Sequence, residues 1–117
     1  QLEKLTGWIL EKRQLADKYA RVFKNIPEVK FIHEPAGTRS NYWLNAIIIE
    51  GATIEIRDSI LQALNDTNYM SRPAWTLLCD LPPFINCPRM DGLTIARSIE
   101  QSLINLPSSP KLLRGVR

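Results

Sequence analysis

The chain has 117 residues, 44% hydrophobic and 23% charged, which is the balance of one ordinary globular domain and too short for two. Fifteen Lys and Arg against twelve Asp and Glu give a formal net charge of +3, and the basic residues are spread along the chain, which argues against a nucleic-acid partner. No window approaches the roughly 18 continuous apolar residues of a membrane span, so we expect a soluble, cytoplasmic domain without a membrane partner.

The first predicted element is an amphipathic helix over residues 2–26, about 35 Å long at 1.5 Å per residue. Pro27 closes it, because proline lacks an amide donor and disfavours helix in the preceding residue. The helical pattern already runs at Leu2 without a capping residue before it. We therefore expect that the chain was cut from a longer protein.

A short extended piece, residues 29–32, precedes a loop that contains Pro35 and Gly37. The stretch "SNYWLNAIIIE", residues 40–50, then favours a strand over 41–50, since aromatic and β-branched residues suit a pleated sheet. Its run 46–49 lacks alternation, which indicates a strand covered on both faces.

Thr53 is the predicted N-cap of a second helix, with Glu55 in its first turn. Asn68 is a suitable stop, because asparagine tolerates a left-handed backbone better than other non-glycine residues. A short strand over 69–72 should follow and end at Pro73.

Residues 73–90 contain four prolines and no periodicity, yet they are rich in Trp, Phe and Leu, which is typical of a functional loop. Asp91 is expected to cap a third helix through about residue 101, and "SLINLPSS" follows as a last strand and turn. The order of elements predicts an α+β two-layer sandwich, in which helices back a small, mostly antiparallel sheet.

The sequence shows no convincing nucleophile with a neighbouring base, no carboxylate pair and no set of metal ligands that could form a catalytic centre within this chain. His33 is the only histidine, and pairing it with Cys79 as base and thiol nucleophile would rest on residue identity alone. Cys79 and Cys87 form no CxxC pair, so two reduced thiols are expected instead of a disulfide framework or a zinc site. We assign no catalytic residue and no metal ligand to this chain.

Three places could bind a ligand. A buried strand is preceded by Asn41, Tyr42 and Trp43. The Asn41 amide could bind a ligand, or it could equally form hydrogen bonds with the backbone of its own loop. Arg72 lies between a strand end and Pro73, where its guanidinium would be held in place. It could bind a carboxylate or phosphate of a ligand, or it could form an ion pair on the protein surface. Trp75 could be a wall for a ring-shaped ligand or a plug that anchors its loop.

These same stretches, "SNYWLNAIIIE", "RDSILQALNDTNYMSRPAWTLL" and "LPPFINCPRMDGLTIARSIEQSLINLPSS", resemble the C-terminal small domain of the DegT/DnrJ/EryC1/StrS family of pyridoxal-phosphate-dependent sugar aminotransferases. Within the family the sequence looks closest to the branch that makes legionaminic acid and bacillosamine-type amino sugars. The resemblance covers almost the whole chain, with its motifs in the right order.

The resemblance implies a homodimeric enzyme that transfers an amino group from glutamate to a nucleotide-linked keto sugar, for amino sugars of surface polysaccharide. Pyridoxal 5'-phosphate is the implied cofactor, with its Schiff-base lysine in a large N-terminal domain absent from this chain. Residues 1–117 would then be one small domain, inactive alone, and its first helix would cover the large domain. Arg72 and Trp75 match the family's RPxW loop near the substrate, and Asn41 and Tyr42 would face the cofactor cleft.

Two positions depart from the family pattern. Cys79 stands where many members carry a histidine, and a thiol cannot offer the two-nitrogen hydrogen bonding of imidazole. Asn68 replaces the usual glycine, a milder change because asparagine also accepts the turn.

An alternative interpretation is a stand-alone, non-catalytic module that binds a small molecule or regulates, such as a ferredoxin-like sensor. Such a module should have a capped N-terminus and little uncovered apolar surface on its first helix.

Overall fold

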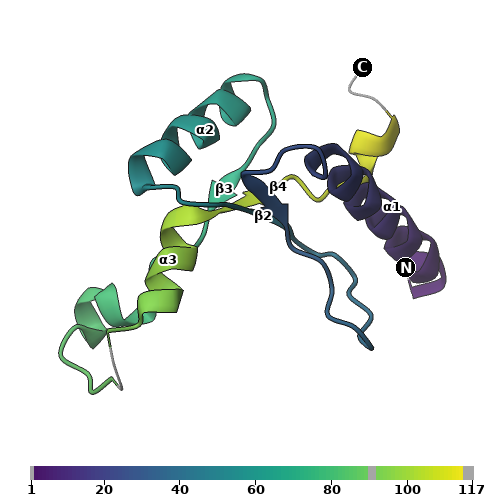
Figure 1. Ribbon diagram of the computed structural model, residues 1–117. Helices are drawn as coiled ribbons and strands as arrows, with labels where there is room; N and C mark the ends of the chain where they lie inside the picture. The colour runs from purple at the N-terminus through teal and green to yellow at the C-terminus, as the bar shows by residue number, and fades with distance from the viewer. Residues whose placement is uncertain (1, 90–91, 115–117) are drawn as a thin grey trace.

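The structure is a computed structural model of the chain, and it describes residues 2–89 and 92–114. The helices and strands follow the predicted order: α1 (Leu5–Phe23), β1 (Val29–Phe31), β2 (Asn45–Ile49), α2 (Ile54–Asp66), β3 (Arg72–Pro73), α3 (Thr94–Ser102) and β4 (Leu103–Leu106). Figure 1 shows α1 and α2 at different ends of the small sheet, with α3 running directly into β4.

The four strands form one antiparallel sheet in the order β1-β2-β4-β3. The longest pairing joins β2 to β4, where Ile47 lies opposite Ile104 and Asn45 opposite Leu106. β3 is an edge strand that pairs only with β4, through Arg72 opposite Asn105 and Pro73 opposite Ile104. The predicted α+β class, with helices backing a small antiparallel sheet, is confirmed.

The core lies between one face of the sheet and the helices α1 and α2. Ile47 and Ile49 of β2 and Ile104 and Leu106 of β4 point into it, because residues two apart in a strand share a face. Helical side chains complete this cluster: Ala16, Tyr19, Ala20, Phe23, Ile60, Leu61 and Leu64.

The expectation that β2 is covered on both faces is only half met. Ile47 and Ile49 are buried, whereas the alternate residues Ala46 and Ile48 are half-buried. The described residues therefore cover one face of the sheet fully and the other in part.

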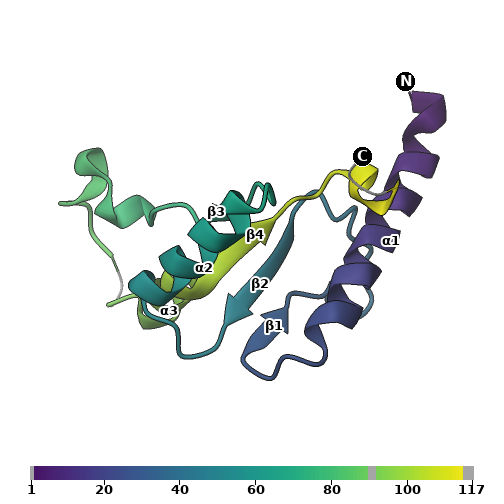
Figure 2. The same ribbon diagram turned by 90° about the horizontal axis from the view of Figure 1, so that it is seen from above.

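Helix α1 is shorter than the predicted residues 2–26. A 3-10 turn, Leu2–Lys4, precedes it, and the regular helix ends at Phe23. The Ile26 amide donates to the Phe23 carbonyl at 3.0 Å, a tight turn that breaks the α-helical ladder before Pro27. In Figure 2 the N-terminal half of α1 projects beyond the sheet.

The strand predicted over 41–50 begins only at Asn45. Tyr42 has a left-handed backbone with φ of 46°, and its amide donates to the Ser40 hydroxyl at 3.0 Å. A residue with positive φ cannot continue a strand, so residues 40–44 form a turn that local propensity did not reveal.

Helix α2 has the predicted ends. The Thr53 hydroxyl accepts a hydrogen bond from the Ile56 amide, and Asn68 beyond the helix has φ of 64°. The following strand differs from the prediction over 69–72, because Pro73 belongs to β3 and pairs with Ile104. An edge strand tolerates proline, since its outer amides need no partner in the sheet.

The long loop contains two 3-10 turns, Leu78–Asp80 and Pro82–Phe84, and α3 begins at Thr94. Its N-cap position is Leu93, with φ of 54° and no capping side chain. The predicted cap, Asp91, lies outside the described residues.

The molecule is extended for its length. Its radius of gyration is 16.3 Å and its principal extents are 46 × 32 × 27 Å, whereas a compact domain of this size has a radius of gyration of about 13 Å. Within the described part of the chain, no helix is long and apolar enough to cross a membrane.

Candidate functional site

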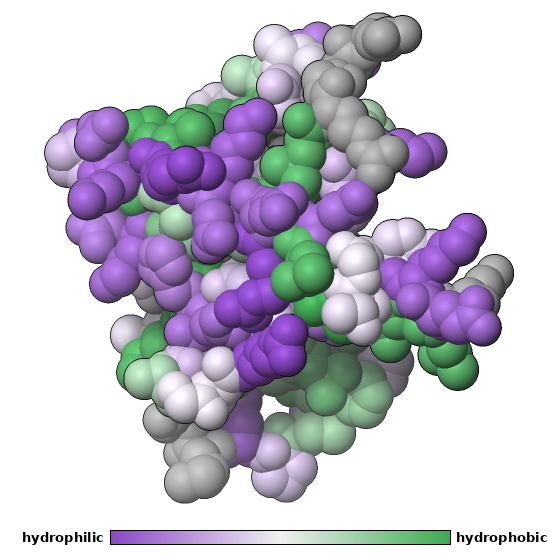
Figure 3. Space-filling view, turned by 90° about the vertical axis from the view of Figure 1, so that its right-hand side faces the viewer, coloured by the Kyte–Doolittle hydropathy of each residue, from purple (hydrophilic) through white to green (hydrophobic). Residues whose placement is uncertain are grey.

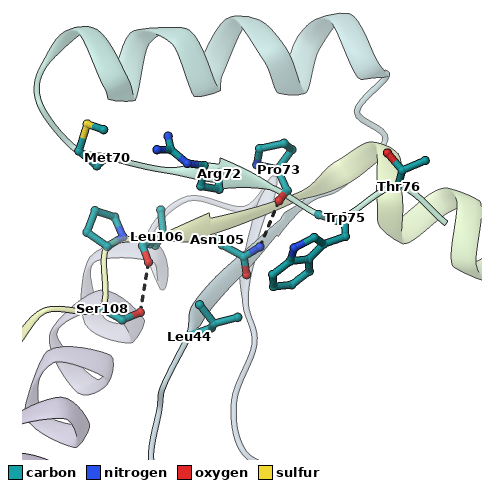
Figure 4. Close-up of a pocket in the computed structure, with 11 residues that line it drawn as sticks. Leu44, Met70, Arg72, Pro73, Trp75, Thr76, Asn105, Leu106 and Ser108 are labelled. Carbon is teal, nitrogen blue, oxygen red and sulfur yellow. Dashed lines mark hydrogen bonds between the residues drawn. The ribbon is translucent and has the colours of Figure 1, made fainter. Parts of the chain in front are cut away.

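A cavity of about 650 Å³ lies along the free edge of the sheet, beside β3 and the end of β4 (Figure 4). It combines apolar side chains with a few polar ones. Its lining residues are Leu44, Met70, Arg72, Pro73, Ala74, Trp75, Thr76, Asn105, Leu106, Pro107 and Ser108.

The backbone that leads into this cavity is held by α2. Ser71 is fully buried, and its amide donates to the Asn65 side-chain oxygen at 2.8 Å. The Asn65 amide nitrogen donates in turn to the Ser71 carbonyl at 3.3 Å. One side chain thus gives Ser71 the donor and acceptor that a neighbouring strand would supply, and this fixes where Arg72 starts.

Arg72 is exposed and lines the cavity. Within the described part of the chain, its Nη1 donates only to the neighbouring Ser71 carbonyl, at 3.2 Å. Among residues 2–89 and 92–114, no carboxylate pairs with it, so the alternative of a surface ion pair is not seen there. In Figure 4 the guanidinium extends to one side of β3, while the Trp75 indole lies on the other.

Trp75 is 72% exposed. A side chain that anchored the loop as a plug would be buried, so the described residues leave the indole as an open apolar wall. Figure 4 places it beside Asn105 and Leu44. Arg72 and Trp75, both predicted from the sequence, therefore line one cavity.

Asn41 lies elsewhere, in a hollow of about 230 Å³ that Thr6, Ile9, Arg39 and Ser40 also line. Its side-chain oxygen accepts a hydrogen bond from the Trp43 amide at 3.0 Å, closing a local turn. The oxygen therefore has the structural role that was the alternative interpretation, and the amide nitrogen is the group left for a ligand.

Tyr42 is separated from both hollows. Its ring is 8% exposed and packs in the core, 6.4 Å from the Phe31 ring, and its hydroxyl accepts from the Glu34 amide at 3.3 Å. The structure thus shows Tyr42 as an anchor of the loop around Asn41, with its hydroxyl already engaged.

An ion pair fastens the same loop to α1. The Arg13 guanidinium binds the Glu34 carboxylate through both nitrogens and donates to the Ser40 carbonyl at 2.6 Å, while its carbon lies 5.5 Å from the Tyr42 ring centre. Glu34 also accepts from the Ser40 amide. These hydrogen bonds, from Arg13 first and then Ser40, lower the pKa of Glu34 to about 2.

The two cysteines are unpaired and line one small cavity of about 270 Å³. His33 borders a different hollow and stacks edge-on against Phe31 at 5.1 Å. Beside Cys79, the Arg97 guanidinium binds Asp80 through two nitrogens and holds the pKa of that carboxyl below its usual range. His33 and Cys79 thus border separate cavities, which disfavours the pairing of base and thiol.

Sequence reasoning missed Leu44, Asn105 and Ser108 as cavity residues. Asn105 carried a detectable signal, since it is a polar residue within the apolar run of the last strand. Leu44 and Ser108 carried none, because each follows or precedes a strand end whose position depends on the register of the sheet.

The described residues do not fit a pyridoxal 5'-phosphate site. A lysine that forms a Schiff base is activated by desolvation or a charged neighbour, in a site from which water is excluded. Five of the six lysines are exposed, including Lys24 and Lys30 beside a hollow of about 590 Å³. The sixth, Lys12, is half-buried, and its Nζ donates to the Ser108 carbonyl at 2.9 Å. We therefore derive no step through this cofactor from the chain's own side chains.

Several known proteins are similar to this chain. GDP-perosamine synthase of Vibrio cholerae is 30% identical over 112 residues, which cover 96% of this chain and 30% of that protein. Helicobacter pylori PseC, an aminotransferase involved in the biosynthesis of pseudoaminic acid, superimposes with a TM-score of 0.84 at 20% identity, over 96% of this chain and 30% of its own. The E. coli GDP-4-keto-6-deoxy-D-mannose-3-dehydratase with bound hydrated pyridoxal phosphate gives 0.75 at 20% identity, over 94% and 29%.

The two solved structures establish the likeness in fold, and the chain spans about 30% of the length of these relatives. None of them identifies the legionaminic acid and bacillosamine branch, which stays a prediction. The family model for DegT/DnrJ/EryC1/StrS aminotransferases matches residues 1–115, which is nearly the whole chain. The chain therefore belongs to the DegT/DnrJ/EryC1/StrS aminotransferase family.

Proposed function

We propose that this chain is the substrate-side small domain of a pyridoxal-phosphate-dependent aminotransferase that acts on a nucleotide-linked keto sugar. Glutamate is the proposed amino donor, and the product serves the synthesis of amino sugars for surface polysaccharide. Membership of the family and the similarity to GDP-perosamine synthase of Vibrio cholerae support this proposal.

The observation that carries the proposal is that an arginine and an open aromatic wall line the same cavity, with their side chains on opposite sides of β3. Arg72 has no carboxylate partner among the described residues, and a guanidinium binds phosphate oxygens through two parallel hydrogen bonds. The exposed Trp75 indole offers a flat apolar face for a ring. A diphosphate joined to ring systems would engage both.

The cofactor belongs to a larger domain in this proposal, where it supplies the electron sink for amino transfer. The residues of this chain bind and orient the substrate. Arg72 and Trp75 hold the nucleotide sugar, the amide nitrogen of Asn41 offers a second contact, and Tyr42 holds the turn that presents Asn41.

Helix α1 supplies the proposed contact with the larger domain. Its apolar stripe packs on the core through Leu15, Ala16 and Tyr19, and continues toward the N-terminus through Leu5, Trp8 and Ile9. Trp8 is 45% exposed there, beyond the end of the sheet. We propose that the pyridoxal-phosphate-binding domain covers this part of the stripe, in an enzyme that works as a homodimer.

The decisive experiment replaces Arg72 by alanine in the full-length protein that contains this chain. A hydrogen bond to a charged group contributes about 1.5–3 kcal/mol, so the KM for the sugar nucleotide should rise roughly 10- to 100-fold. The absorbance of the bound cofactor should stay as in the unmodified protein. Arg72→Lys should recover the affinity only in part, because lysine keeps the charge without the planar fork.

Arg21→Ala is the matched control, since Arg21 is exposed on α1 and, of the residues that the structure describes, bonds only the Asp17 carbonyl, at 3.3 Å. It should leave KM unchanged. Unchanged kinetics for Arg72→Ala would refute the assignment of Arg72 to the substrate.

A further inference from the structure

Asn105 is a buried polar residue in the middle of the apolar strand β4. It is 7% exposed, lies opposite Arg72 of β3 and lines the 650 Å³ cavity. Its neighbours on the strand, Ile104 and Leu106, belong to the core. The side-chain oxygen of Asn105 still reaches the solvent in the cavity, since among the described residues the buried side-chain atom without a hydrogen-bond partner is the Asn45 oxygen.

Only one end of this amide has a partner within the described chain. Its nitrogen donates to the Pro73 carbonyl at 3.3 Å. Because a carbonyl can only accept, this bond fixes the orientation of the amide and turns its oxygen away from Pro73. Figure 4 shows that oxygen directed into the space beside Leu44 and Trp75.

The Asn105 oxygen accepts no hydrogen bond from any of the described residues. The nearby Ser108 hydroxyl is already engaged, since it accepts from the Asn45 amide at 3.0 Å and donates to the Leu106 carbonyl at 3.2 Å. The cavity therefore presents one fixed acceptor, in a surround that is mostly apolar. Such a group rejects a ligand without a donor, because binding would leave the oxygen desolvated and unpaired.

The walls define the shape of the matching ligand. Trp75 and Leu44 offer flat and apolar surface beside the acceptor, and Arg72 also lines the cavity, with its guanidinium on the other side of β3. The ligand should thus be a flat ring with an N–H at its edge and an anionic group attached. A keto oxygen of a sugar does not match, because two acceptors cannot form a hydrogen bond. A sugar hydroxyl can donate to the oxygen, and the methylated analogues in the test below separate a hydroxyl donor from a ring N–H.

We propose that this cavity binds the nucleobase of a nucleoside diphosphate, with a ring N–H donating to the Asn105 side-chain oxygen. The ring lies against Trp75, and the diphosphate reaches Arg72. Guanine carries such a donor at N1, and uracil and thymine carry one at N3. This inference rests on the proposed function, since it identifies the nucleobase as the part of the nucleotide sugar that this cavity binds.

The test measures affinity by calorimetry, using the full-length protein, GDP and UDP. Each is compared with its methylated analogue, 1-methyl-GDP or 3-methyl-UDP, in which the ring donor is blocked. For the nucleotide that binds, methylation should weaken binding about tenfold or more. In Asn105→Ala, which removes the acceptor and leaves room for the methyl group, the two forms should bind equally.

Gln62→Ala is the matched control, because it removes an exposed amide on α2 whose one partner among the described residues is Asp66. It should keep the full penalty for methylation. Equal affinity of the unmodified protein for both forms would overturn the inference, and this comparison needs no variant to fold. A penalty that persists in Asn105→Ala, or a failure of both nucleotides to bind, would also overturn it.

The outcome is separable from that of the proposed function. A protein that transaminates a sugar nucleotide without discriminating the methylated forms contradicts the inference alone. A protein that discriminates them but transfers no amino group contradicts the proposed function and leaves the nucleobase site standing.

Discussion

Glu34 is a single residue on which the loop over 33–44 depends. Its carboxylate receives the Arg13 guanidinium and the Ser40 amide, and its pKa falls from 4.5 to about 2. The folded state thus binds a proton less readily than the unfolded chain does. The stability that this carboxylate contributes is complete above about pH 4.5, and it is lost as the pH falls toward 2.

Glu34→Gln should remove this contribution at neutral pH, because an amide cannot make the charged pair. The melting temperature of the variant should lie below that of the unmodified protein at pH 6, and the two should converge as the pH approaches 2. Thermal unfolding at several pH values measures the difference. Asp80 also has a lowered pKa, but it is present in both proteins and cancels. A gap that does not change with pH would contradict the assignment.

Among the elements, the short strand β3 depends most on side-chain support. It has two residues, one of them proline, and its entry is held by the two hydrogen bonds between Asn65 and buried Ser71. Because Arg72 follows Ser71 directly, the clamp also fixes the start of the proposed substrate contact.

Asn65→Ala should cost about 1–3 kcal/mol of unfolding free energy, since it leaves a buried amide and carbonyl unpaired. It should also raise the KM for the sugar nucleotide, because β3 would no longer hold Arg72 in place. Urea unfolding and steady-state kinetics of the full-length protein measure both effects. Gln62→Ala, one turn earlier on α2, should change neither. A loss of stability at constant KM would show that the clamp does not position the site.

At the scale of the whole molecule, apolar surface remains open along α1. Figure 3 shows the side of the molecule where α1 lies, and hydrophobic residues are exposed there among mostly hydrophilic ones. The radius of gyration of 16.3 Å agrees with a domain whose first helix extends past its own sheet. The proposed larger domain would bury the stripe at Leu5, Trp8 and Ile9.

Trp8→Glu should therefore destabilise the full-length protein by about 2 kcal/mol or more, because it would place a charge in an apolar interface. Gln14→Glu is the control, since it adds the same charge at an exposed position of the same helix, and it should change stability by less than about 0.5 kcal/mol. Thermal unfolding measures both. Equal effects would mean that Trp8 faces solvent in the complete protein.

Much of the fold could be predicted because the signals are local. The cap at Thr53, the left-handed Asn68 and the order of elements depend on neighbours in sequence, and each agrees with the structure. Predictions failed where tertiary contacts override propensity. The strand predicted from residue 41 begins at Asn45, because Tyr42 turns into the core, and Pro73 pairs in a strand because β3 lies at the edge of the sheet.

The candidate site divides in the same way. Arg72 and Trp75 could be singled out as a cation and an aromatic residue within an apolar loop, and the fold brings both to one cavity. The sequence alone also determined the α+β class and the family, since ordered motifs and hydrophobic periodicity are properties of the chain itself. Only the tertiary structure separated Asn41 and Tyr42 from that cavity and added Asn105. The reason is physical, because the pairing of β3 with β4 and the hydrogen bond to Pro73 decide where the Asn105 oxygen points.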